Sequence, residues 1–183
     1  MNKKLVFAAI PIALIPYLAL FALATIFFST EVPFFRTIME SVFHNNALIL
    51  LAALFIYCIA AAVLTGICFF VSIHKNWDAL AVAKTAMIIK LAQVPAYILI
   101  YALGVLFVIT IFTIPFSFLL FVIDCLSLWM TGLFVIASVV IASRNHTLIF
   151  KDVLWVVLLQ FVFCADVIAS VCLYRKLKII AQR

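Results

Sequence analysis

A stretch of about 27 nearly unbroken apolar residues, Phe116–Ala142, constrains this chain more than any other feature. It reads FSFLLFVIDCLSLWMTGLFVIASVVIA, which is long enough to cross the hydrocarbon core of a bilayer as one helix. The stretch contains a single acid, Asp124. An ionisable side chain at membrane depth is costly and rare, so Asp124 needs a structural or a functional reason.

The composition extends the same conclusion to the whole chain. Of its 183 residues, 70% are hydrophobic and only 10% are charged. Soluble domains carry about a quarter of their residues as charged side chains, and they could not cover this much apolar surface. We therefore predict an integral, multi-pass membrane protein for which the lipid bilayer is both solvent and first partner.

The hydropathy pattern predicts an all-α fold: a compact bundle of five transmembrane helices in one domain, residues 1–183. A short amphipathic helix at about 31–44 is expected to lie in the headgroup layer, and a lid over a pore is its alternative interpretation. The turn between the third and fourth spans is expected at Ile114-Pro115, because proline stops a helix. The five spans are expected at Leu5–Phe28, Ala47–Ile73, Leu91–Thr113, Phe116–Ala142 and Val153–Tyr174.

The first span begins with basic residues and carries an Ala22-x-Ala24 pattern, as a signal peptide would. Its apolar run continues to Phe28, so we expect a retained helix rather than a cleaved leader. With a cytoplasmic N-terminus, about seven basic residues would face the cytoplasm and about five the outside. This small difference favours a cytoplasmic N-terminus, and the alternatives suggested by the basic C-terminal tail are the opposite orientation and a last helix that does not fully cross. We expect the plasma membrane of a bacterium as the location.

Polar residues inside the spans recur at helical spacing. In the fourth span, steps of seven residues place its polar side chains on one face, because a heptad drifts only about 20° on a straight helix. That face carries Ser117, Asp124, Thr131 and Ser138, with Ser127 close by. The third span carries Lys90, Gln93, Tyr97, Tyr101 and Gly104 on one face. The fifth carries Asp166, Ser170 and Tyr174, with Gln160 off that line.

Asp124 and Asp166 lie at matched depth if the last two spans are antiparallel, each roughly 12 Å from the same side of the membrane. Two facing carboxyls could share a proton or bind a cation, which is the functional hypothesis. The alternative is a packing role, with each acid hydrogen-bonded to a hydroxyl such as that of Ser127, Thr131 or Ser170. Lys90 is expected to extend toward the membrane edge, and the alternative is that it reaches inward.

The sequence contains few signs of catalysis. The five cysteines lie in apolar segments without CxxC spacing, and the three histidines lie in connections. No HExxH, GxSxG or Walker pattern occurs. No basic block suggests nucleic-acid binding. We therefore expect neither an enzyme nor a cofactor or metal site.

The remaining function classes are an interaction protein and a carrier. We expect a non-enzymatic accessory or scaffold component, whose partner is another membrane protein or a second copy of the chain. The alternative is a small proton- or cation-coupled transporter or channel that uses the two acids. A water-filled cavity reaching both acids would favour the carrier, and a packed interior with an exposed groove would favour the interaction protein.

Overall fold

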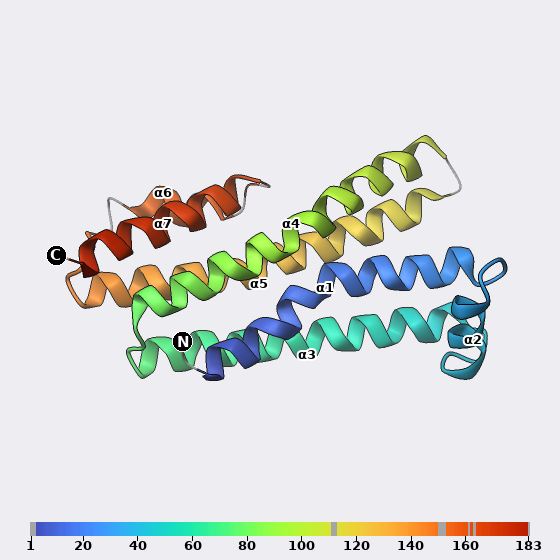
Figure 1. Cartoon of the computed structure of the whole chain (residues 1–183), viewed down its shortest axis with the longest axis horizontal. Helices are drawn as coiled ribbons and strands as arrows, with labels where there is room; N and C mark the ends of the chain where they lie inside the picture. The colour runs from blue at the N-terminus through green and yellow to red at the C-terminus, as the bar shows by residue number, and fades with distance from the viewer. Residues whose placement is uncertain (1–2, 111–112, 150–152, 161, 163, 183) are drawn as a thin grey trace.

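The structure is a computed structural model that describes residues 3–110, 113–149, 153–160, 162 and 164–182. Within these ranges every regular element is an α-helix, so the expected all-α class is confirmed. The helices pack side by side into an elongated bundle (Figure 1). They are α1 (Lys3–Phe28), α2 (Pro33–Ser41), α3 (Ala47–His74), α4 (Ala79–Ile109), α5 (Ile114–Arg144), α6 (Leu154–Leu159) and α7 (Ala165–Ala181).

Four of the described helices are long and apolar enough to cross a membrane, which supports the prediction of a multi-pass membrane protein. The candidate spans are Ala9–Phe28, Ala47–His74, Ala79–Ile109 and Ile114–Arg144. The expected third span, Leu91–Thr113, overlaps the later part of α4, which runs from Ala79 to Ile109. Helix α4 begins at Ala79, because the Asp78 carboxylate accepts hydrogen bonds from the first free backbone N–H groups, those of Leu80 and Ala81.

The predicted fifth span, 153–174, is not one continuous helix. Helix α6 ends at Leu159 and α7 begins at Ala165, so the segment forms a short helical hairpin. Cys164, just before α7, has a positive φ of 67° with ψ −37°, a conformation that residues other than glycine seldom adopt. The Gln160 side chain donates to the Val156 carbonyl and covers a group left free at the end of α6.

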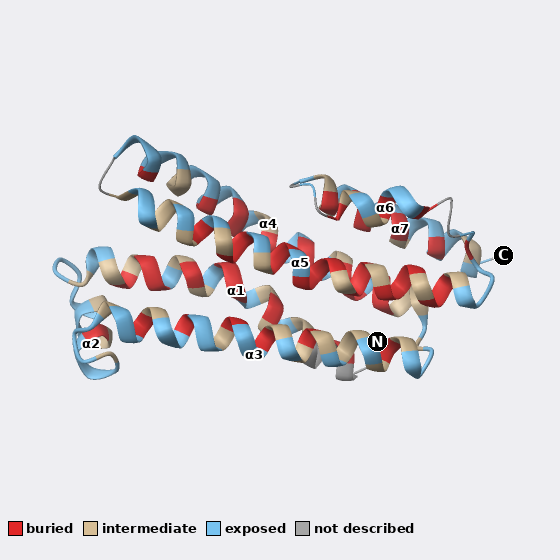
Figure 2. Ribbon diagram, turned by 180° about the vertical axis from the view of Figure 1, so that it is seen from behind, coloured by how far each residue is buried: buried red, intermediate tan, exposed pale blue. Residues whose placement is uncertain are grey.

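The hairpin brings the C-terminus back to the end of the bundle where α5 finishes. Both views show α6 and α7 lying along one half of the α4–α5 pair, with the N- and C-termini at the same end (Figures 1 and 2). A fifth complete span would have carried the C-terminus to the opposite end. Helix α5 lies at the centre of the bundle, and buried residues follow it along most of its length (Figure 2).

Prolines inside the long helices leave backbone carbonyls that other helices satisfy. Pro16 lacks the N–H that would bond to the Ile12 carbonyl, and the Gln93 side chain of α4 donates to that oxygen instead, at 2.8 Å. Tyr57 of α3 donates to a further carbonyl of α1, that of Pro11, at 2.9 Å; no proline leaves this carbonyl free, because Ile15 lies four residues later. Proline in a membrane helix is tolerated when neighbouring side chains supply such bonds. These bonds tie α1 to α3 and α4.

Helix α2 occupies part of the range expected for the amphipathic helix, at the end of the bundle opposite the termini (Figure 1). Met39 is its buried residue, while Phe34 and most of its other side chains are exposed. Arg36 donates to the carbonyls of Ser29 and Thr30 just after the end of α1. At the α4–α5 turn, α5 begins at Ile114 with Pro115 in its first turn, close to the expected break.

Candidate functional site

One face of α4 carries three polar side chains into the interior of the bundle. Lys90, Gln93 and Tyr97 follow steps of three and four residues, and all three are buried. Tyr101, expected on the same face, is 71% exposed. The α4 face therefore turns from the core toward the outside between Tyr97 and Tyr101.

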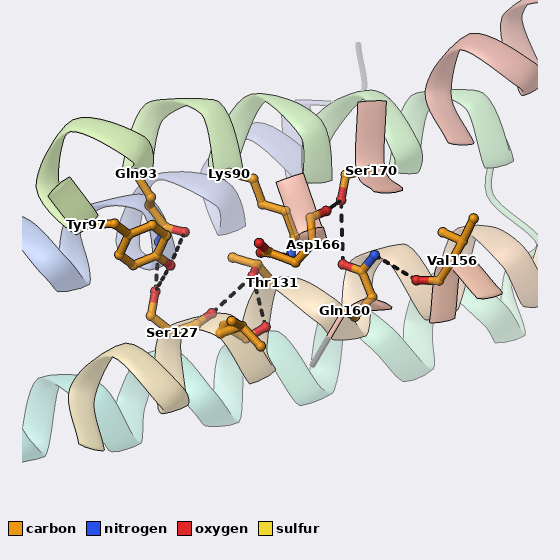
Figure 3. Close-up of polar contacts among 10 residues, drawn as sticks. Lys90, Gln93, Tyr97, Ser127, Thr131, Val156, Gln160, Asp166 and Ser170 are labelled. Carbon is orange, nitrogen blue, oxygen red and sulfur yellow. Dashed lines mark hydrogen bonds and ion pairs between the residues drawn. The ribbon is translucent and has the colours of Figure 1, made fainter. Parts of the chain in front are cut away.

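A buried ion pair joins α4 to the start of α7. The Lys90 Nζ lies 2.5 Å from Asp166 Oδ2, and the Lys90 side chain is 0% exposed (Figure 3). The expectation that Lys90 extends to the membrane edge does not describe this structure. Asp166 lies in the first turn of α7, where the helix dipole favours a negative charge. A charge at this depth is tolerated because it is paired and covered by protein.

A closed ring of hydrogen bonds adjoins the ion pair (Figure 3). Gln93 Nε2 donates to Ser127 Oγ at 2.9 Å, and Tyr97 Oη donates to Gln93 Oε1 at 2.9 Å. Ser127 Oγ and Tyr97 Oη lie 3.1 Å apart. Because the Tyr97 hydroxyl gives its proton to Gln93, Ser127 is the donor in this third bond. With the Gln93 bond to Ile12, the ring connects α1, α4 and α5.

The other polar residues of this region bond mainly to the backbone of their own segment. Thr131 Oγ1 donates to the carbonyls of Ser127 and Leu128, and Ser170 Oγ donates to the Asp166 carbonyl at 2.7 Å. Ser170 also contacts Gln160 Oε1 at 3.5 Å across the α6–α7 hairpin (Figure 3). These bonds satisfy buried hydroxyls and amides, which is the ordinary requirement of a packed interior.

Asp124 lies outside this network. It is 5% exposed, and its Oδ1 has no hydrogen-bond partner among the described residues. The proposed pairing of Asp124 with Asp166 is not what the described residues show: the Asp166 carboxylate faces Lys90, and no hydrogen bond joins it to Asp124. Native proteins leave few buried polar atoms unpaired, so the Oδ1 of Asp124 is the unusual atom of this region.

Two cavities open along the α4–α5 pair. The first, about 280 Å³, lies at the tip of the hairpin against Tyr97, Cys164 and Asp166. The second, about 590 Å³, lies beyond the hairpin between the later part of α4 and the early part of α5, and Asp124 lines it. Tyr101 lines both cavities. Their walls are almost entirely apolar, which does not match a water-filled ion path.

The residues expected to form the site thus divide into three groups. Asp124 lines the second cavity, and Tyr101 lies at the junction of the cavities. Gly104 and Ser117, which also line the second cavity, were not among the expected site residues. Helical spacing had placed Gly104 on the face of Tyr97 and Ser117 on the face of Asp124, but neither residue was assigned to the site. The polar core around the ion pair holds Lys90, Gln93, Tyr97, Ser127, Thr131, Gln160, Asp166 and Ser170.

Neither the search for metal-binding clusters among the described residues nor the comparison with known proteins assigns a function to this site. Among the described residues, no group of three or more histidine, cysteine, aspartate or glutamate side chains is placed to hold a metal ion. No protein-family model, curated protein or solved structure matches this chain. The function has to be argued from the ion pair, the hydrogen-bond ring, the cavities and Asp124.

Proposed function

We propose that this chain is a non-enzymatic component of a membrane assembly and binds another membrane protein as an accessory or scaffold subunit. The observation that carries the proposal is the second cavity, which we call the α4–α5 groove. Its walls include Tyr101, Gly104, Ser117, Phe121 and Asp124. The α6–α7 hairpin lies along the other half of this helix pair (Figure 2), and the residues that line the groove all belong to α4 and α5.

The polar core supports the same function. Lys90 is paired with Asp166, and Gln93, Tyr97 and Ser127 bond to one another. Side chains that satisfy each other specify how helices pack, and they leave no free ligand for a transported ion. The groove, by contrast, has the size of a binding site, since ligand pockets commonly measure about 300–1,000 Å³.

We also propose that the N- and C-termini face the cytoplasm. The hairpin places the basic residues of α7 at the end of the bundle that holds the start of α1 and the end of α5 (Figure 1). The opposite end holds Arg36. Connections rich in lysine and arginine remain in the cytoplasm, so this arrangement favours the orientation more strongly than five spans did.

Filling the groove tests the proposed function. The full chain, tagged and expressed in its native cells, is expected to run in mild detergent as a complex of defined mass above the 20.5 kDa of the chain. Gly104→Trp is expected to release most of that partner, because the indole would occupy the groove. A Cβ at position 104 would lie 3.7 Å from Ser117 Oγ, an ordinary contact, so Gly104→Ala should keep the complex.

Size-exclusion chromatography with light scattering provides the measurement. Ile59→Trp is the matched control, because Ile59 is exposed on α3 away from the groove. A chain that runs alone, or a complex indifferent to Gly104→Trp, would contradict the proposal. A mass that is a multiple of 20.5 kDa would indicate self-association instead.

The unpaired Oδ1 of Asp124 favours a second candidate function, a proton- or cation-coupled carrier. Under the accessory function, vesicles containing the wild-type chain are expected to dissipate an imposed pH or sodium gradient no faster than vesicles containing Asp124→Asn. A trapped pH- or sodium-sensitive dye measures both rates. Faster dissipation by the wild type than by Asp124→Asn and by empty vesicles would replace the accessory function with the carrier.

A further inference from the structure

The α4–α5 groove has the shape of a binding site for a helix. Its residues on α4 recur from Ile100 to Ile109, and those on α5 from Ser117 to Cys125, at steps of three and four along both helices. This corresponds to roughly 13 Å of groove length. Gly104 and Ser117 lie opposite each other, and Ser117 Oγ donates to the Gly104 carbonyl at 3.2 Å. Small residues at this level let another backbone approach closely.

The same helix pair is already covered by helices in its other half. There the α6–α7 hairpin packs on α4 and α5, and α7 supplies Asp166 to Lys90 (Figures 1 and 3). One half of the α4–α5 pair therefore binds a helix through a buried acid–base pair. The groove continues along the remaining half with no helix of the described chain in it.

Asp124 indicates what the missing helix carries. It is the charged side chain among the described residues that line the groove, and its Oδ1 is buried without a hydrogen-bond partner. A carboxylate at this depth, roughly 15 Å along α5 from Ile114, needs a cation or a hydrogen-bond donor. The apolar walls exclude a ligand that is polar throughout.

The described residues of a second copy supply no lysine or arginine at that level. Among the described residues, Lys90 is buried against Asp166, and Lys84 and Arg144 lie near helix ends. Arg36 lies on α2, after the end of α1. The other described lysines and arginines lie toward the end of the bundle that holds both termini, whereas Asp124 lies in the half of α5 nearer the opposite end; they are Lys3, Lys4, Lys75, Arg175, Lys176 and Lys178. A lysine or arginine at the level of Asp124 would therefore come from a different protein.

We propose that the partner presents a transmembrane helix with a lysine or arginine at the level of Asp124, seated in the α4–α5 groove. This inference rests on the proposed accessory function and names the chemistry of its partner. The basic side chain of the partner pairs with the Asp124 carboxylate, and its apolar side chains fill the space beside Gly104 and Tyr101. In the Lys90–Asp166 pair, the cation lies on α4 and the acid lies on the helix that packs against it. In the proposed pair, the acid lies on α5 and the cation lies on the partner helix.

Synthetic helices test the proposal without the native partner. The full chain in lipid vesicles contains three tryptophans that serve as energy donors, and a dansyl-labelled leucine-rich transmembrane peptide serves as acceptor. We expect a peptide with one central lysine to bind roughly tenfold more tightly than the same peptide with leucine there. In Asp124→Asn the two peptides are expected to bind alike, at the level of the leucine peptide.

Asp78→Asn is the matched control. It removes one carboxylate outside the groove, and asparagine caps a helix as well as aspartate does, so the tenfold preference should persist. Equal binding of the two peptides to the wild type would overturn the proposal. A preference that survives Asp124→Asn would also overturn it, because the lysine would then be bound elsewhere.

Two further outcomes identify other occupants. Dodecylamine that binds in an Asp124-dependent way, without a preference for the lysine peptide, would make the groove a site for amphiphilic amines and overturn the proposal. Asp124-dependent self-association would make the occupant a second copy. If Gly104→Trp releases a native partner but the lysine peptide shows no preference, the accessory function stands and only the helix chemistry fails. If no native complex exists, the accessory function fails whatever the peptide does.

Discussion

Replacing Lys90 with methionine is expected to lower the free energy of unfolding by about 3–5 kcal/mol. The Lys90 and Asp166 side chains are 0% and 3% exposed, and their charged atoms lie 2.5 Å apart. Removing one partner of such a pair leaves the other charge buried without compensation, which costs far more than the pair itself contributes. Unfolding of the full chain in mixed micelles with increasing dodecyl sulfate measures the change.

The double replacement Lys90→Met with Asp166→Leu separates charge from packing. A buried ion pair replaced by apolar side chains of similar volume is often as stable as the original, so the double variant should recover most of the loss. Lys84→Met is the matched control on α4, because Lys84 is exposed, and we expect a change within about 0.5 kcal/mol. Equal stability of Lys90→Met and Lys84→Met would mean that the ion pair is not formed in the membrane.

The C-terminal helix is expected to be labelled from the same side of the membrane as the α5–α6 connection. Single cysteines at Lys178→Cys and Thr147→Cys should both react with an impermeant maleimide applied from that side, and Ser41→Cys should react only from the opposite side. The physical reason is the reversal at Cys164, which returns α7 toward the end of α5 instead of completing a span. Vesicles of uniform orientation, labelled intact and then opened, give the two signals.

The α6–α7 hairpin and a complete fifth span predict labelling of Lys178→Cys from opposite sides of the membrane. Five complete spans would place Lys178→Cys on the side of Ser41→Cys, so the label would appear from the opposite face. The unmodified chain, whose five cysteines lie in the helices and the hairpin turn, gives the background. Labelling of Lys178→Cys together with Ser41→Cys would exclude the hairpin in the membrane.

Periodicity predicted part of the polar core because it depends only on helical geometry. Lys90, Gln93 and Tyr97 were expected on one face of a helix, and the structure buries all three. Tyr101 continues the same spacing but lies outside, because the α6–α7 hairpin ends beside it and the groove begins there. Where a face stops being covered depends on the neighbouring helices, and the spacing within one helix does not contain that information.

Lys90 could not be predicted as the partner of Asp166, because the depth of Asp166 was deduced from a continuous fifth span. Hydropathy averaged over a window is as high for α6, the turn and the start of α7 as for a single helix. The turn between α6 and α7 includes Cys164, whose positive φ cysteine seldom adopts and hydropathy does not indicate. Once the chain turns back there, Asp166 meets Lys90 instead of Asp124.

The amino-acid pattern alone predicted an all-helical chain whose helices are long and apolar enough to cross a membrane, with spans close to α1, α3 and α5 and with Asp124 as the acid that needs an explanation. These properties follow from apolar length and helical period, which are local. The three-dimensional arrangement of the helices established the other properties: the last segment is a hairpin, Lys90 and Asp166 form a pair, and Asp124 lines a groove. Those properties depend on which helices cover one another, because a buried charge is stable only where another helix supplies its partner.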